Sequence, residues 1–200
     1  MFPLGSVLFP GAVLPLHVFE PRYRRLVRDC LDGEREFGVA LIERGSEVGG
    51  GDVRTTTGTV ARLVEVVELD DGRYGIVAVG TRRVRVVAWL PDDPYPLADV
   101  EDWPEELDAT DDELSSVLTP VLARLRRVLA MAAELGEPVA AAATEVSDDP
   151  VVASYHASAL APLGPADHQR LLAAPGPARR LALLADDLAE AEARCSFLLS

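Results

Sequence analysis

Residues 14–26 read LPLHVFEPRYRRL, and this stretch changes character in the middle. Its first six residues suit an extended strand, although Pro15 restricts such a strand to an edge or a bulge. Pro21 suits the first turn of a helix, and apolar residues then recur at 23, 26, 27, 30 and 31, which is a helical spacing. The stretch therefore predicts a strand that passes directly into a helix ending near Gly33.

Several short strands are predicted downstream of that helix. The candidates are residues 36–43, 57–69, 73–79, 82–90 and 97–103. Asp71-Gly72 predicts a hairpin, Gly80-Thr81 predicts a turn, and the broken alternation at Val66-Val67 predicts a bulge. Five or six short strands separated by turn signals indicate a small barrel or sandwich.

The pattern becomes helical after Trp103-Pro104. Thr110 and Glu113 have the spacing of a capping box, and a long apolar stripe follows them. Further helices are expected after Pro150, around residues 171–172, and over a final seam from Leu181 to Leu198, which is typical of a helical bundle. The sequence thus predicts a β-rich region over 1–108 and an α-helical region over 109–200.

Charge and composition exclude several classes of function. The formal net charge is −14, so the chain should repel phosphate backbones, and we expect no nucleic-acid partner. All 19 basic residues are arginine. The absence of lysine excludes a P-loop lysine, a Schiff-base lysine and a Ser–Lys dyad within this chain.

No familiar metal, cofactor or catalytic motif stands out. The three histidines are separated and lack metal-ligand spacing, and residues 49–51 form a glycine run without the lysine of a phosphate-binding loop. We therefore expect no catalytic residue, cofactor or metal. Cys30 and Cys195 lie on apolar helical stripes and are predicted to be core thiols. The N-terminus lacks the pattern of a signal peptide or a membrane span, so we expect a soluble, cytoplasmic protein.

The opening segment resembles the substrate-binding N-terminal domain of Lon proteases. The matching residues are PL at 3–4, VLFPG at 7–11 and LPLHVFEPRY at 14–23. Residues 37–52, 58–66 and 78–86 are similar to the family as well, and the helical half is similar more loosely at 153–172. The resemblance implies an α+β fold, in which a PUA-like β pseudobarrel with one inserted helix precedes a C-terminal helical bundle.

The resemblance also implies a function. It is closest to the stand-alone bacterial Lon-domain proteins, which recognise polypeptides without ATPase or peptidase modules. We therefore expect a non-catalytic module that binds unfolded or damaged polypeptides, or a protease or chaperone partner, in protein quality control. Exposed sheet edges could accept an extended peptide by strand addition. We expect a monomer or a weak homo-oligomer, and no membrane partner.

Two alternatives stay open at this point. One is a small-molecule-binding protein or an unrecognised hydrolase with a pocket near His17, Arg44 and Arg54. The other is a self-association protein that uses the seam from Leu181 to Leu198.

Four side chains are the candidates for contact with a partner: Arg22, Arg25, His17 and Arg44. We expect Arg22 and Arg25 to face outward together, because they lie three residues apart on a helix. His17 is expected in the core or at its rim, and Phe19 is expected to anchor the strand end in the core.

Overall fold

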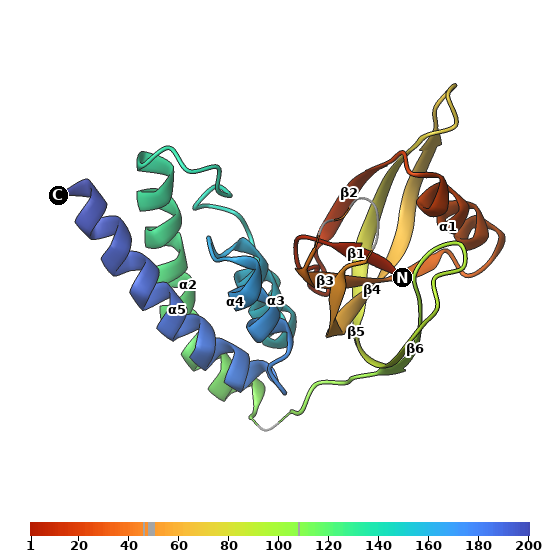
Figure 1. The fold of residues 1–200 in the computed structure, drawn as a ribbon. Coiled ribbons are helices and arrows are strands. Elements are labelled where there is room, and N and C mark those ends of the chain that lie inside the picture. The colour runs from red at the N-terminus through yellow and green to blue at the C-terminus, as the bar shows by residue number, and fades with distance from the viewer. Residues whose placement is uncertain (46, 48–50, 108) are drawn as a thin grey trace. The chain divides into compact units, whose positions relative to one another are not determined.

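A computed structural model describes residues 1–45, 47, 51–107 and 109–200 (Figure 1). The chain forms two compact units, Met1–Pro104 and Glu105–Ser200, which we call the β-unit and the helical unit. Six strands and five helices in the described part of the chain bear out the α+β class.

The β-unit is built on a mixed sheet. Its strands pair in the order β1-β3-β4-β5-β2, and β6 pairs with the remaining part of β5. The parallel pair is β1 with β3, and the other described pairs are antiparallel. The strands are β1 (Phe2–Leu4), β2 (Val13–Val18), β3 (Glu36–Arg44), β4 (Val53–Glu68), β5 (Tyr74–Leu90) and β6 (Leu97–Asp102).

The predicted turn at Gly80-Thr81 is wrong, because β5 runs through it as one strand. Residues 74–79 pair with β2 and residues 84–90 pair with β6, with a bulge at Thr81 between them. A Cβ on Gly80 would lie 2.3 Å from the carbonyl oxygen of Phe9. The glycine is therefore needed for a close backbone approach rather than for a reversal of the chain. The bulge predicted at Val66-Val67 lies slightly earlier, at Val64.

The strand-to-helix joint is confirmed. Helix α1 (Pro21–Asp32) has Pro21 in its first turn and buries Tyr23, Leu26 and Val27 in the core of the β-unit. The ring of Tyr23 stacks on Phe2 with their centroids 4.1 Å apart. Phe19 is 52% exposed, so its predicted role as a core anchor is wrong. Tyr23 rather than Phe19 packs on Phe2.

The first residue is fixed to the sheet as well. The Met1 amine donates a hydrogen bond to the carbonyl oxygen of Pro96 at 2.7 Å. The Met1 side chain also covers Gly38, where an added Cβ would lie 2.2 Å from the Met1 sulfur. Burial lowers the pKa of this amine to about 6.

The helical unit contains α2 (Asp111–Glu134), α3 (Pro150–Leu160), α4 (Pro165–Leu172) and α5 (Pro177–Leu199). The predicted capping box begins α2: the Glu113 N–H donates to Thr110 Oγ1 at 3.3 Å, and the Thr110 N–H donates to Glu113 Oε2 at 2.8 Å. Helix α5 packs along α2 and buries most of the predicted seam within the unit. The buried seam residues are Leu181, Leu184, Leu188, Ala191 and Cys195.

A fully buried arginine organises this unit. The Arg180 guanidinium donates to both oxygens of the Glu105 carboxylate at 2.9 and 3.0 Å, and to Ser154 Oγ at 2.8 Å. It also lies 3.6 Å from the centroid of the Tyr155 ring, and the Tyr155 hydroxyl donates to Glu105. Sequence reasoning missed this cluster.

Both cysteines are free thiols that lie in or against a core. Cys195 is buried as predicted, whereas Cys30 is half-buried against the core. In the part of the chain that the structure describes, no helix is both long and apolar enough to cross a bilayer.

Candidate functional site

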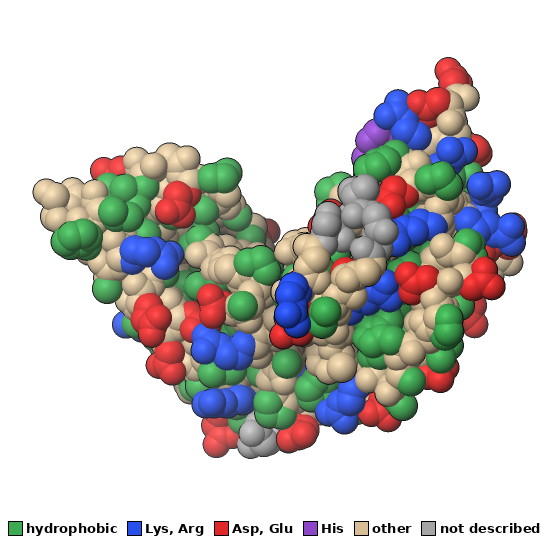
Figure 2. Space-filling model, in the orientation of Figure 1, with side chains coloured by type: hydrophobic (Ala, Val, Ile, Leu, Met, Phe, Trp, Pro, Cys, Tyr) green, Lys and Arg blue, Asp and Glu red, His purple; other side chains and the backbone are tan. Residues whose placement is uncertain are grey.

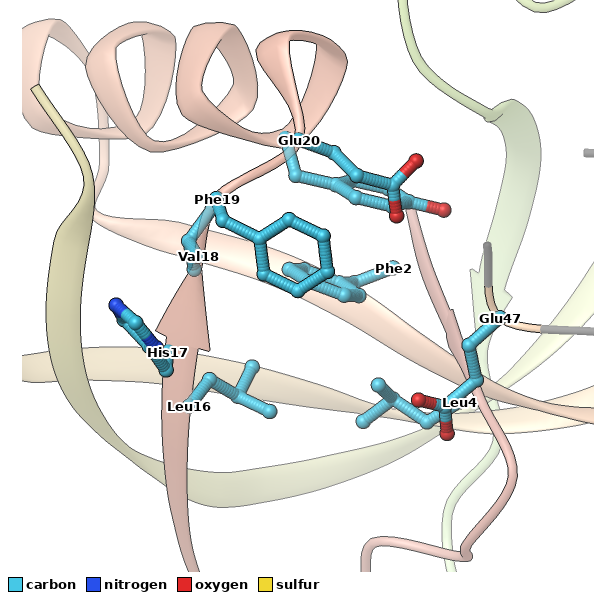
Figure 3. A pocket seen from close by; sticks show the side chains of 9 residues that line it. Phe2, Leu4, Leu16, His17, Val18, Phe19, Glu20 and Glu47 are labelled. Atoms are coloured by element: carbon cyan, nitrogen blue, oxygen red, sulfur yellow. The ribbon is translucent and has the colours of Figure 1, made fainter. Parts of the chain in front are cut away.

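A small pocket lies between the two terminal strands of the pairing order, β1 and β2 (Figure 3). We call it the seam pocket, and its volume is about 80 Å³. Phe2 and Leu4 of β1 face Leu16 of β2 across it, while the start of α1 contributes Glu20 and Tyr23. The remaining lining residues are His17, Val18, Phe19 and Glu47.

A shallow groove lies on the solvent side of the same region. We call it the outer groove; it is lined by Pro15, His17, Glu65, Val67, Gly75 and Val77, together with Leu16 and Ile76. Strand pairing sets Pro15 opposite Val77 and His17 opposite Gly75, and Gly75 in turn lies opposite Val67. Because Gly75 has no side chain and the space above it is open, a gap separates His17 from Val67. Val67 is 49% exposed.

The rim of the seam pocket is acidic. Glu20 and Glu47 each place a carboxylate there, and the described lining residues include no arginine. Arg22 pairs with Glu20 at 3.1 Å, and its guanidinium lies 4.5 Å from the centroid of the Tyr23 ring. Burial raises the pKa of Tyr23 to about 12, so its phenol is neutral at physiological pH.

The four predicted contact residues lie in different surroundings. His17 is exposed and borders both the seam pocket and the outer groove, so of the two expected places it lies at the rim and not in the core. Arg22 is largely covered, whereas Arg25 is 60% exposed and pairs with Asp29 at 2.8 Å. The two arginines therefore do not form one exposed face. Arg44 is exposed at the end of β3.

None of the described pockets is lined by His17, Arg44 and Arg54 together. Arg54 is engaged by Asp52 and Asp92 at 2.5 and 3.1 Å and lies over the Trp89 ring, while neither described pocket beside His17 includes Arg44 or Arg54.

In the described part of the chain, no group of three potential metal ligands was found. Burial lowers the pKa of His168, and its Nε2 lies 3.0 Å from the Ala161 carbonyl oxygen, which indicates a packing role.

The surface charges are mixed on the face that Figure 2 shows. In each unit, arginine side chains are interspersed with acidic ones there, and no continuous basic area is seen.

Comparisons with known proteins agree with this architecture. Residues 1–190 match the family model described as the ATP-dependent protease La (LON) substrate-binding domain. The chain belongs to this Lon family. It is 33% identical over 156 residues to Lon protease 2 of Sorangium cellulosum, and 35% identical over 147 residues to Lon protease 2 of Myxococcus xanthus.

The Lon relatives are much longer than the region they share with this chain. The two alignments cover 77% and 71% of this chain, but 19% and 17% of the two proteases. The chain thus spans less than a fifth of the length of these relatives.

Solved structures of Lon N-terminal domains cover nearly the whole chain. The Lon N-terminal domain protein from Xanthomonas campestris is 31% identical, with a TM-score of 0.66, and the match covers 92% of this chain and 94% of that one. The N-terminal domain of the Mycobacterium avium complex Lon protease has a TM-score of 0.63 at 20% identity, which supports the fold alone. The resemblance inferred from the sequence is confirmed.

Sequence reasoning did not find most of the residues around the two hollows. Phe2, Leu4, Gly75 and Val77 come from β1 and β5, and they join β2 through strand pairing and the closing of the sheet. The one local signal was Pro15, because proline in a strand indicates an edge.

Proposed function

We propose that this chain is a non-catalytic module that binds extended segments of unfolded polypeptides through the β-unit. The observation that carries the proposal is the side of β2 that pairs with no described strand, which has an apolar pocket on one face and an apolar groove on the other. Membership of a substrate-binding domain family supports it. The absence of lysine supports a role without peptidase chemistry, because a Ser–Lys dyad cannot form within this chain.

The exposed apolar side chains around β2 suit this role. Val13 at the start of β2 is 63% exposed, Phe19 of the seam pocket is 52% exposed, and Val67 of the outer groove is 49% exposed. An unfolded polypeptide offers apolar side chains that a folded protein buries, so such a surface can distinguish the two. We infer that the module holds these segments as an adaptor in protein quality control, alone or beside a protease or chaperone.

Of the four predicted contact residues, His17 is the best placed for this role. It borders both hollows, so a bound segment would touch it on either face of β2. Arg25 and Arg44 are exposed and stay candidates for contact with a partner protein. Arg22 would act on a bound segment only indirectly, because it pairs with Glu20 at the rim of the seam pocket.

A binding titration tests the proposal. A fluorescently labelled model protein, kept unfolded by neutral alkylation of its cysteines, should bind the purified chain at micromolar concentrations, whereas its folded form should not. Val67→Ser should weaken this binding, because it replaces an apolar side chain of the outer groove by a polar one without adding a charge. Val100→Ser is the matched control, because Val100 is 45% exposed on β6 and lines neither hollow. Equal binding of folded and unfolded forms, or no binding, would contradict the proposal.

A further inference from the structure

In the part of the chain that the structure describes, β2 pairs with a strand on one side only, and the pairing register identifies its unpaired side. The Gly80 N–H donates to the Ala12 carbonyl oxygen at 2.9 Å, just before β2. Antiparallel pairing alternates, so Leu14, Leu16 and Val18 direct their backbone groups toward β5, and residues 13, 15 and 17 direct theirs away from it. Pro15 lies among the latter, so its missing N–H costs no bond to β5.

From this edge and its surroundings we propose a specific class of ligand. The free edge of β2 binds an extended polypeptide segment in which one aliphatic side chain is flanked by lysine or arginine. The segment adds as a strand beside residues 13–17, its aliphatic side chain enters the seam pocket, and its basic residue meets the acidic rim. This inference rests on the proposed polypeptide-binding function and specifies its ligand.

The size and lining of the seam pocket explain why the ligand should insert one aliphatic side chain. A cavity of about 150 Å³ holds benzene, whereas the seam pocket measures about 80 Å³. Its walls are Phe2, Leu4 and Leu16, with Tyr23 behind Phe2. The pocket therefore has room for one aliphatic side chain and is small for a large aromatic one.

The carboxylates around the seam pocket explain why the ligand should carry a basic residue. Glu20 and Glu47 supply two carboxylates, and Arg22 offsets one of them. Arg22 also donates to the backbone carbonyl oxygen of Glu47 at 3.2 Å, so it is held in place beside the rim. Glu65 adds a further carboxylate on the outer-groove side of β2. A basic residue in the ligand meets this negative excess, and the net charge of −14 favours its approach.

Three labelled peptides test the inference on the full chain by fluorescence anisotropy. They share one alternating aliphatic sequence and differ in their flanking residues, which are lysine, serine or glutamate. The lysine peptide should bind about two- to fivefold more tightly than the serine peptide at low salt, and the glutamate peptide more weakly. High salt should reduce the difference, because the rim is accessible to solvent. A lysine peptide with N-methylated amides on its pairing edge should not bind.

Substitutions at the rim complete the test. The double variant Glu20→Gln, Glu47→Gln should lose the preference for lysine and still bind the serine peptide. Glu34→Gln is the matched control, because Glu34 is exposed after α1 and lines neither hollow. Far-ultraviolet ellipticity checks that the variants fold, and the salt dependence of the unsubstituted chain gives a measurement that needs no variant.

The outcomes separate this inference from the proposed function. Equal affinity for the lysine and glutamate peptides, or a preference that survives the double substitution, would overturn the cationic class while leaving polypeptide binding intact. Full binding of the N-methylated peptide would overturn strand addition. If neither the peptides nor the unfolded model protein bind, the proposed function fails as well.

Discussion

Replacing Glu105 by alanine should destabilise the helical unit, because it removes the counter-charge of a buried arginine. The Arg180 side chain is fully buried, and Glu105 accepts two hydrogen bonds from it and supplies the opposite charge. Removing one partner of a buried ion pair costs about 3–5 kcal/mol. The Glu105 side chain is 15% exposed, so water can approach the site and the lower end of this range applies.

Two optical probes distinguish the units in a urea titration. Both tryptophans, Trp89 and Trp103, lie in the β-unit, whereas α2 to α5 supply most of the helical ellipticity. With an m-value of about 1.5 kcal/mol/M, a loss of about 3 kcal/mol shifts the ellipticity midpoint down by about 2 M urea. The tryptophan fluorescence midpoint should stay unchanged.

The matched control is Glu106→Ala, because the Glu106 side chain is exposed and only its backbone packs against the turn at Pro175. It should shift the ellipticity midpoint little. The double variant Glu105→Leu, Arg180→Met should recover much of the lost stability, since apolar residues can replace a buried pair. A shift for Glu105→Ala no larger than that for Glu106→Ala would refute the reasoning.

Three further predictions use the same two probes. Thr110→Ala removes the cap of α2 and should cost the helical unit about 1 kcal/mol, seen as a lower ellipticity midpoint; an unchanged midpoint would contradict the capping box. Gly58→Ala should lower the free energy of unfolding of the β-unit by about 2 kcal/mol, measured by tryptophan fluorescence, because its Cβ would lie 2.3 Å from the Val39 carbonyl oxygen. Gly75→Ala is the control and should lower it far less, because the space beside Gly75 is open. The stability of the β-unit should rise by about 2 kcal/mol from pH 6 to pH 8, because the Met1 amine has a pKa of about 6 when folded and 8.0 when unfolded, so the unfolded state binds more protons over this range; acetylation of the amine should remove this rise.

The elements that could be predicted from sequence are those with a local cause. The apolar spacing after Pro21 and the capping box at Thr110 act over a few residues, and both occur as predicted. The turn predicted at Gly80-Thr81 was wrong because a glycine that lets the Phe9 backbone approach closely looks the same in the sequence as a glycine in a turn. The core position predicted for Phe19 was wrong because an apolar residue at the end of a strand can face either solvent or the core, and the ring that stacks on Phe2 is that of Tyr23.

The candidate site was less predictable, because long-range pairing creates it. Phe2 and Leu16 meet through the closing of a sheet whose order is not the order of the sequence. The buried Arg180 cluster had one sequence signal: Arg180 lies four residues before Leu184, on the face of α5 that packs inward. Its partner Glu105 belongs to the dense run of acidic residues over 99–113. Nothing in that run indicates that Glu105 pairs with a buried arginine.

The buried Met1 amine gives the chain a built-in chemical reporter. Since the sequence has no lysine, this amine is the one primary amine among its 200 residues. An amine-selective reagent should therefore modify the folded chain at a single position, and only when β1 separates from the Pro96 carbonyl. The labelling rate measures how often this edge opens. A polypeptide bound beside Phe2 and Leu4 should slow the labelling, so the same reaction reports occupancy of the seam pocket without a fluorophore on either partner.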